Sequence, residues 1–503
     1  GDVQADGRDI YVTTPTGSPV SRRVLQVGPG DRARVAFALT GGTRYVVYFG
    51  NPDADAPGEL PLWRGVLLET WAYPGGPITT LEQVRAVFEA ATELLGRDFR
   101  ETVFLGHNPF GPHEQIASRF TARLVTPRTG SYTFACSSND ASFLVIDGEM
   151  VIDNGGRHGP QRRAHKTGEV RLTAGMHELV FYHVCTGGDP VAALTWKSPT
   201  GGQYEPLPPD AFTPISRGVA GPMESQHQDW SADFAVEHAG ETWMKDRYYQ
   251  RYVFTARHAG GRPGAWQWSF GDGHHGAGRE VEHVYLRSGQ YAVTVTGEAA
   301  GVGADARSRT HRIVVSRPWD RVTNRKLDSL RRHAKIVAGY DFSALSPEAT
   351  ALAVEMFLRT GDKTGVVRAG AAFAARDQAP AECIRQILSP FADALVARGM
   401  NVRAVAALQK AAKMTKDPGV CAEMLAKAGR VCLLDRTKTE EALALFQTVI
   451  KRYSALTRSG AIRDARMGIG DVWRSRGDYD KAAEAYEKAH TGRSAVGTKA
   501  PIV

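Results

Sequence analysis

The hydrophobic period of the chain changes once, and this change limits what the chain can fold into. Up to about residue 315, short runs such as SRRVLQV and HELVFYHVC alternate apolar and polar residues between clusters of Gly and Pro. Such runs are typical of half-buried antiparallel strands. From Arg321 onward Ala, Leu, Val and Arg dominate with a helical period. We therefore predict a multidomain protein with an all-β N-terminal part and an all-α C-terminal part.

The length of 503 residues suggests about three or four domains at roughly 150 residues each. A stretch rich in Pro, Gly and Ser, PLPPDAFTPISRGVAGPMES, indicates a linker between two β regions. One helix is predicted within the β part, from Thr79 to Gly96, because apolar residues recur there at helical spacing after a Thr that can cap the helix. The predicted parts are a small antiparallel β domain at 1–59, a β-sandwich at 60–215, a linker at 216–232, an immunoglobulin-like β domain at 233–318, a helical array at 319–490 and a flexible tail at 491–503.

The formal net charge of +8 is unevenly distributed along the chain. From Arg321 onward Lys and Arg exceed Asp and Glu by roughly twelve, which leaves the first part mildly acidic. This excess indicates either an acidic partner for the helical part or a solvated helical surface. Nucleic-acid binding is not expected, because the net charge is its one support and no groove-entering motif accompanies it. No apolar run is long enough to span a bilayer.

The stretch SSNDASFLVIDG places Asn139 and Asp140 directly before an apolar strand. Turn geometry by itself favours Asn and Asp at such a place. A carboxylate and a carboxamide on adjacent residues can also coordinate a hard cation such as calcium, whose remaining coordination sites can take sugar hydroxyls. Both interpretations stay open on the residues alone.

Cys136 and Cys185 lie in two strand-like runs of the same predicted domain. Strand neighbours can meet the geometry of a disulfide, and an exported protein would permit one. The alternative is two buried thiols. Cys383, Cys421 and Cys432 lie in helical patterns and are expected to be small core residues.

The segment from about Leu60 to Ile215 resembles the lectin-like β-sandwich of the protective-antigen (PA-fourteen) family. The residues that carry the resemblance are Tyr132, Phe134, Asn139, Asp140, Asp147, Gly148, Leu172, Gly175, His177, Tyr182 and Trp196. In sugar-binding members the resemblance implies an Asp-Asp pair, joined by a cis peptide, whose carboxylates bind calcium. Here Asn139 stands in the first place and Asp140 in the second, so calcium affinity is expected to be reduced. Further ligands would come from a loop at 153–158 or at 186–189.

Two other segments resemble known families. The run WQWSFGDGHHGAGREVEHVYLRSGQYAVTV is similar to a polycystic-kidney-disease (PKD) domain, which implies a rigid extracellular spacer or protein-contact module. The matching residues are Trp268, Phe270 to Gly273, His283, Tyr285, Gly289 and Tyr291. The run RYVVYFGN more loosely resembles the end of an N-terminal domain of bacterial surface proteins, through Tyr45, Tyr48, Phe49, Gly50 and Asn51.

The helical part resembles a tetratricopeptide (TPR) array. In ARMGIGDVWRSRGDYDKAAEAYEKAH, large and small residues occupy the positions that let two antiparallel helices interlock. These residues are Ile469, Gly470, Trp473, Gly477, Tyr479, Ala482, Tyr486 and Ala489. Stacked hairpins need one another to bury a core, so an array of about four is expected. The resemblance implies a concave face that binds a protein partner.

No motif of a known catalytic class occurs in the sequence: there is no Gly-x-Ser-x-Gly, no His-Glu-x-x-His and no phosphate-binding loop with its Lys. We expect a non-catalytic protein. The resemblances together imply an exported protein of the cell envelope, periplasm or cell surface that mediates structural assembly and protein–protein interaction. The alternative they leave open is a calcium-dependent glycan-binding adhesin or an accessory module of a carbohydrate-active system.

Overall fold

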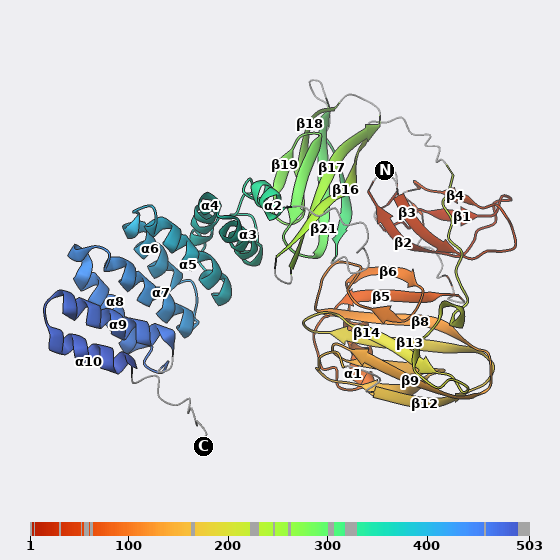
Figure 1. The fold of residues 1–503 in the computed structure, drawn as a ribbon. Helices are drawn as coiled ribbons and strands as arrows, with labels where there is room; N and C mark the ends of the chain where they lie inside the picture. The colour runs from red at the N-terminus through yellow and green to blue at the C-terminus, as the bar shows by residue number, and fades with distance from the viewer. Residues whose placement is uncertain are drawn as a thin grey trace, which may run out of the picture. The chain divides into compact units, whose positions relative to one another are not determined.

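The computed structural model describes residues 3–4, 6–29, 32–51, 53–54, 60, 64–161, 166–221, 231–244, 247–259, 263–299, 306–316, 329–456 and 459–490. The predicted tail at 491–503, most of the predicted linker at 216–232 and the stretch 319–328 lie outside the described residues. The chain divides into two compact units, a β-rich one and one that comprises residues 272–274 and the helical part. The predicted order of β structure followed by helices is confirmed (Figure 1).

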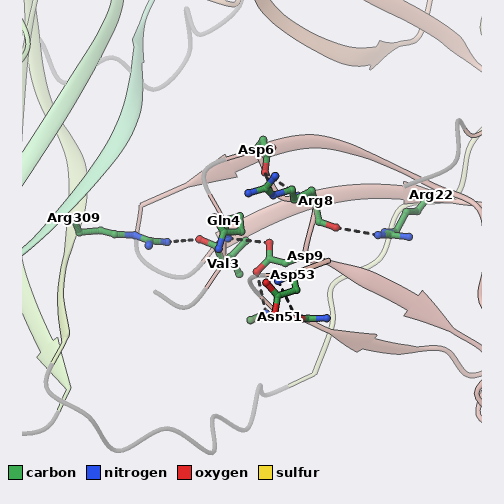
Figure 2. Close-up of polar contacts among 10 residues, drawn as sticks. Val3, Gln4, Asp6, Arg8, Asp9, Arg22, Asn51, Asp53 and Arg309 are labelled. Atoms are coloured by element: carbon green, nitrogen blue, oxygen red, sulfur yellow. Dashed lines mark hydrogen bonds and ion pairs between the residues drawn. The ribbon is translucent and has the colours of Figure 1, made fainter. Parts of the chain in front are cut away.

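The N-terminal part is a small antiparallel unit, as predicted. Its strands are β1 (Tyr11–Thr13), β2 (Arg22–Gly28), β3 (Arg32–Phe37) and β4 (Val46–Tyr48), with β1 paired to β4 and β2 to β3. The fully buried Asp9 carboxylate accepts hydrogen bonds from the backbone N–H of Gln4 at 2.9 Å and of Gly50 at 3.0 Å (Figure 2). It thereby holds the start of the chain to the segment after β4. Figure 2 also shows the Arg22 guanidinium donating to the Arg8 carbonyl at 3.2 Å.

A β-sandwich follows, and its two antiparallel sheets enclose one core. The large sheet has the strand order β11-β10-β13-β8-β5-β6, and the small sheet has the order β12-β9-β14-β15 with β7 paired to β14. The large sheet consists of β5 (Val66–Ala72), β6 (Leu94–Arg100), β8 (Ile116–Thr126), β10 (Ser142–Ile146), β11 (Glu149–Asn154) and β13 (Gly175–Cys185). The small sheet consists of β7 (Phe104–Leu105), β9 (Gly130–Ser138), β12 (Lys166–Leu172), β14 (Ala192–Lys197) and β15 (Glu205–Pro206), and a 3₁₀ turn, η1 (Pro209–Ala211), follows.

Alternate residues of the strands face the core between the sheets. Phe120 and Phe181 from the large sheet meet Tyr132, Phe134 and Trp196 from the small one, and all five are buried. Each large side chain removed from water in this way contributes roughly 1.5–3 kcal/mol. The residues that resemble the lectin-like family at Tyr132, Phe134 and Trp196 therefore serve this core.

The outer face of the large sheet is covered by the one helix of the sandwich, α1 (Leu81–Ala90), which buries Leu81, Val84 and Val87 against it. Thr80 caps the helix in a capping box with Gln83. The prediction of a helix from Thr79 to Gly96 was wrong at its C-terminal end. From Leu94 the chain forms β6, because pairing with β5 satisfies the backbone groups of both strands.

A second β domain contains a three-stranded sheet, β16-β17-β20, and a four-stranded sheet, β19-β18-β21-β22. Its core is aromatic: Phe254, Trp268, Phe270 and Tyr285 are buried, and the Trp268 and Phe270 rings are parallel with centroids 6.0 Å apart. The strands are β16 (Ser231–Met244), β17 (Arg247–Ala259), β18 (Pro263–Ser269), β19 (His275–Ala277), β20 (Glu280–Tyr285), β21 (Gly289–Ala299) and β22 (Arg307–Val315).

The helical unit is a succession of antiparallel hairpins, α3 with α4, α5 with α6, α7 with α8 and α9 with α10 (Figure 1). The described residues thus contain the expected four hairpins, preceded by α2. Its helices are α2 (Leu330–Val337), α3 (Pro347–Thr360), α4 (Lys363–Ala374), α5 (Ala381–Val396), α6 (Asn401–Ala411), α7 (Pro418–Cys432), α8 (Thr439–Arg452), α9 (Gly460–Ser475) and α10 (Tyr479–His490), with a 3₁₀ turn, η2 (Arg436–Lys438), between α7 and α8.

Glycines allow these helices to approach closely. A Cβ at Gly470 of α9 would lie 2.3 Å from the Tyr486 ring of α10, and one at Gly468 would lie 2.3 Å from the Phe446 ring of α8. The Tyr486 hydroxyl also donates to Asp471 at 2.8 Å. The small residue at 470 is therefore required by the ring at 486.

Replacing Gly470 should test this packing. We expect Gly470→Ala to destabilise the helical unit by roughly 1–3 kcal/mol, since the added methyl group overpacks the α9–α10 contact. Gly460→Ala at the start of α9 is the control, because a Cβ there meets no atom within 4 Å. This control should be neutral or stabilising by up to about 1 kcal/mol. Thermal unfolding followed by far-ultraviolet circular dichroism measures both variants, and equal melting temperatures would contradict the packing argument.

Candidate functional site

A row of polar side chains crosses the inner face of the large sheet near one end of the sandwich. The register pairs Asn154 with Ser142, Ser142 with His183, His183 with Ser118, and Ser118 with Thr70. All five side chains are buried. Directly opposed residues point to the same face of a sheet, so this row forms one polar layer inside an otherwise apolar sandwich.

The polar layer is held together by hydrogen bonds within it and to the small sheet. Thr70 and Ser118 hydroxyls lie 3.0 Å apart, and Ser142 Oγ lies 2.8 Å from Ser138 Oγ of β9. The Asn154 amide donates to the same Ser138 hydroxyl at 3.0 Å. Buried polar groups are costly unless bonded in this way. The layer therefore fixes the end of β9, where the Asn139–Asp140 pair begins.

Asn139 and Asp140 form a turn between β9 and β10, and the peptide bond between them is cis. The layer supports the backbone of this turn, since His183 Nε2 lies 2.8 Å from the Asn139 carbonyl oxygen and Ser138 Oγ donates to the Asp140 carbonyl at 2.6 Å. The Asn139 side-chain amide donates to two backbone carbonyls of the loop after β13, Gly187 at 3.0 Å and Asp189 at 2.7 Å. The pair therefore both makes a turn and holds a loop.

The Asp140 carboxylate is bonded on both oxygens. Oδ1 accepts from the backbone N–H of His158 at 3.1 Å, and Oδ2 accepts from the Thr186 backbone N–H at 2.8 Å and hydroxyl at 2.7 Å. The sequence offered a loop at 153–158 or one at 186–189 as the neighbour of the pair. The structure brings both to it, on opposite sides of one carboxylate.

A third segment, which the sequence analysis did not identify, also contacts the loop after β13. His113 Nε2 lies 2.8 Å from Asp189 Oδ1, and Glu114 Oε2 accepts from the Gly188 N–H at 3.3 Å. Gln115 donates from its amide to the Thr186 carbonyl. The run HEQ carries no motif, so only the fold shows that these residues meet loop 186–191.

Burial keeps the groups under the turn neutral. Burial lowers the pKa of His183 to about 4, against the smaller opposing effects of the Asn139 carbonyl and the Asp140 charge. With a carbonyl as its partner, Nε2 of the neutral ring carries the proton. Burial likewise raises the pKa of Cys185 to about 12, and the nearby carboxylates of Asp140 and Glu114 add to this. Cys185 is therefore a thiol at neutral pH and a poor nucleophile.

Cys136 and Cys185 are free, buried thiols, so the predicted disulfide is absent and the alternative of two thiols holds. They lie on different sheets, in β9 and β13. Each sulfur has its own neighbours: Cys136 Sγ lies 3.4 Å from Ser142 Oγ, and Cys185 Sγ donates to the Gly187 carbonyl at 3.5 Å. The three cysteines of the helical unit are buried as expected.

The geometry of the turn does not fit a calcium ion. The amide nitrogen of Asn139 carries hydrogens and cannot be a ligand, yet it is the atom that meets the two loop carbonyls. Turning the amide over would set its oxygen against two carbonyl oxygens, so the bonding network fixes its orientation. No cluster of three or more His, Cys, Asp and Glu side chains suited to a metal occurs among the described residues.

Asp147 and His177, two further residues of the lectin-like resemblance, form a polar pair at the end of β10 that lies opposite the Asn139–Asp140 turn. Asp147 accepts from His177 Nδ1 at 2.6 Å and from the Glu178 backbone N–H at 2.8 Å. Burial opposes the charge on His177, but its bonds to the Thr173 carbonyl and to Asp147 raise its pKa overall. These residues hold the β10–β11 turn to β13 and lie away from the Asn139–Asp140 turn.

Family models identify three domains in the chain. Residues 107–208 match the PA14 domain, residues 248–315 match the PKD domain, and residues 433–495 match the tetratricopeptide repeat. The chain thus contains each of the three modules that its motifs predicted. These domains are typically non-catalytic binding modules, and together they indicate a protein-interaction or carbohydrate-binding role.

Several solved structures are similar to parts of the chain. The PA14 sugar-binding domain from RTX adhesin is 19% identical, and the match covers 30% of this chain and 99% of that one with a TM-score of 0.26. MamA is 20% identical, with 32% and 85% covered and a TM-score of 0.25. The A domain of epithelial adhesin 9 from Candida glabrata, in complex with Galb1-4GlcNAc, is 10% identical, with 28% and 85% covered and a TM-score of 0.22. No curated protein sequence matches the chain.

His183 should make the sandwich sensitive to mild acid. Its folded pKa of about 4 lies below its ordinary value of about 6.5, so the unfolded state binds a proton that the folded state does not. The stability that results is fully present above pH 6.5 and is lost as the pH falls toward 4, by up to about 3 kcal/mol.

The protein is unfolded with urea at pH values between 4 and 7.5, and each sample then receives a brief deuterium pulse at one common pH. Mass spectrometry of peptides from β10 and β13 measures the unfolded fraction of the sandwich in each sample. His183→Gln, which cannot titrate, should lose most of the decline below pH 6.5. His177→Gln is the control, because its raised pKa affects stability above pH 6.5 instead. A decline below pH 6.5 that persists unchanged in His183→Gln would show that another group is responsible.

Proposed function

We propose that the chain is an exported, non-catalytic protein of the cell envelope or cell surface that assembles with another protein through its helical repeats. The PA14 and PKD domains, which are typical of extracellular adhesins, support export. Among the described residues no helix is long and apolar enough to cross a membrane. The observation behind the proposal is that the first helices of the hairpins, α3, α5, α7 and α9, form one side of the helical unit, here called the inner wall.

The first helices of the hairpins form this inner wall. α3, α5, α7 and α9 contact one another in turn, whereas the second helices contact each other less. The more closely spaced helices of a curved stack lie on its inner side, which is the side that such arrays offer to a partner. The tetratricopeptide match supports a protein partner for this face.

Ion pairs connect successive helices along the wall. Arg385 of α5 meets Glu423 of α7 at 2.8 Å, and Lys427 of α7 meets Asp393 of α5 at 2.7 Å. Arg430 of α7 lies 3.7 Å from Asp471 of α9. These side chains are a quarter to two-thirds exposed, so each pair adds at most about 1 kcal/mol to stability.

The pairing of opposite charges indicates the chemistry of the partner. Each of these three cations lies beside a carboxylate, and therefore they do not form the row of unpaired cations that a nucleic-acid backbone would require. A protein surface that carries both positive and negative side chains can form ion pairs with these residues in place of the pairs within the wall. The paired charges therefore favour a protein partner over a polyanion.

Carbohydrate binding by the PA14 domain is the second candidate, supported by the PA14 match. The calcium-dependent form of this function is disfavoured, because the Asn139 amide nitrogen occupies the place where a ligand oxygen would be needed. A glycan array probed with the full chain, with and without chelator, separates the two forms. Glycan binding that chelator removes would support the calcium-dependent form.

Charge reversal on the inner wall tests the leading proposal. We expect the double variant Lys427→Glu, Arg430→Glu to lose crosslinking to its protein partner by about tenfold or more, since two repelling contacts cost at least about 1.4 kcal/mol. The control is Arg403→Glu, Lys410→Glu, which reverses two exposed charges on the second helix α6. The assay is crosslinking in the native host, with partners identified by mass spectrometry.

Wild type and the α6 control should crosslink the same protein. Circular dichroism should show both double variants folded, because surface ion pairs contribute little to stability. Undiminished crosslinking by the α7 variant would contradict the assignment of the inner wall. Protease treatment of intact cells tests export separately, and a chain fully protected inside intact and osmotically shocked cells would contradict it.

A further inference from the structure

We propose that Asn139 takes the place of a bound cation, so that loop 186–191 of the PA14 domain is held closed by an amide and needs no calcium. The inference concerns the loop after β13 and is independent of the function assigned to the helical unit. It rests on where the hydrogens of one side chain point.

Two backbone carbonyl oxygens of the loop converge on one nitrogen atom. Asn139 Nδ2 lies 3.0 Å from the Gly187 oxygen and 2.7 Å from the Asp189 oxygen, and an amide nitrogen has two hydrogens to donate. Both hydrogens therefore have partners. Gly188 lies between these carbonyls with φ +76°, and a Cβ there would be 3.2 Å from the same nitrogen. The loop is shaped around the amide group.

An oxygen at the position of this nitrogen would repel the two loop carbonyl oxygens that the amide attracts. A carboxylate at 139 would face the two loop carbonyl oxygens with no hydrogen between them, and the Asp140 carboxylate is its immediate neighbour in the chain. Such a set of oxygens is stable when a hard cation lies among them. The amide supplies the same attraction through two N–H groups and adds no charge to the turn.

The other contacts of the loop are also made by protein groups. Thr186 donates twice to Asp140, Gly188 donates to Glu114, and Asp189 pairs with His113. Asn139 is buried, with 8% of its surface exposed, so water competes little for its hydrogens. Loop 186–191 therefore closes with protein donors alone, and any ligand that it contacts should bind independently of divalent cations.

The test is local hydrogen–deuterium exchange of loop 186–191 in the full chain, in chelator and in millimolar calcium. Wild type should exchange at the same rate in both. In Asn139→Asp the loss of two hydrogen bonds should speed exchange in chelator by about ten- to a hundredfold. Calcium should slow it again toward the wild-type rate, and calorimetric titration of the variant with calcium should show binding that wild type lacks.

Asn108→Asp is the matched control. Asn108 is equally buried in the same domain, and its amide donates to the Pro112 carbonyl at 2.8 Å, but it meets one carbonyl only and has no adjacent carboxylate. This variant should be destabilised near residue 108 without any response to calcium. A calcium response of Asn139→Asp that Asn108→Asp shares would overturn the proposal.

Three further outcomes decide against the inference. Slower exchange of the wild-type loop in calcium would show that the native site binds the ion. Failure of calcium to change Asn139→Asp would show that the amide does not occupy a cation's place. If Asn139→Asp does not fold in chelator, Asn139→Ala is measured in its place. Asn139→Ala should speed exchange of loop 186–191 and show no response to calcium. A loop as protected in Asn139→Ala as in wild type would show that the Asn139 amide does not hold the loop closed.

Discussion

Two carbonyl oxygens at the end of the PA14 sandwich need hydrogen-bond donors, and the way this need is met organises the surrounding structure. The Asn139 amide satisfies Gly187 and Asp189, and Asp140 satisfies Thr186 and the backbone of His158. Two loops, 153–158 and 186–191, thereby meet at this turn. Because these donors belong to the chain, the hydrogen bonds of this end form within the folded protein itself.

The Asn139–Asp140 turn itself depends on the polar layer beneath it. His183 bonds the Asn139 carbonyl and Ser138 bonds the Asp140 carbonyl, while Ser142 and Asn154 keep Ser138 in place. A polar layer in an apolar core gains stability only when its members are bonded, so it fixes one arrangement of the strands that cross it. The neutral state of His183 belongs to this arrangement, because a charged ring at a fully buried position would be costly.

The domains differ in what they can contribute to function. The PA14 domain has a rigid, internally bonded end, whereas the helical unit exposes rows of paired charges along α5, α7 and α9 that a partner can rearrange. Exposed pairs hold little folding energy, which supports the proposal that they serve recognition. A modular protein that assembles through its repeats and carries its other domains as contact or spacing elements accounts for both observations.

The sequence by itself determined the order of the domains, most strands and the four helical hairpins, because hydrophobic period and the spacing of Gly, Trp and Tyr are local features. It also singled out Asn139 and Asp140. Only the tertiary structure decided that Leu94–Arg100 is a strand, since that segment follows a helical pattern but pairs with β5. It likewise left Cys136 and Cys185 as free thiols on different sheets, and it brought the run from His113 to Gln115 to loop 186–191. These outcomes depend on which backbone groups meet across long distances in the chain, and no local pattern specifies that.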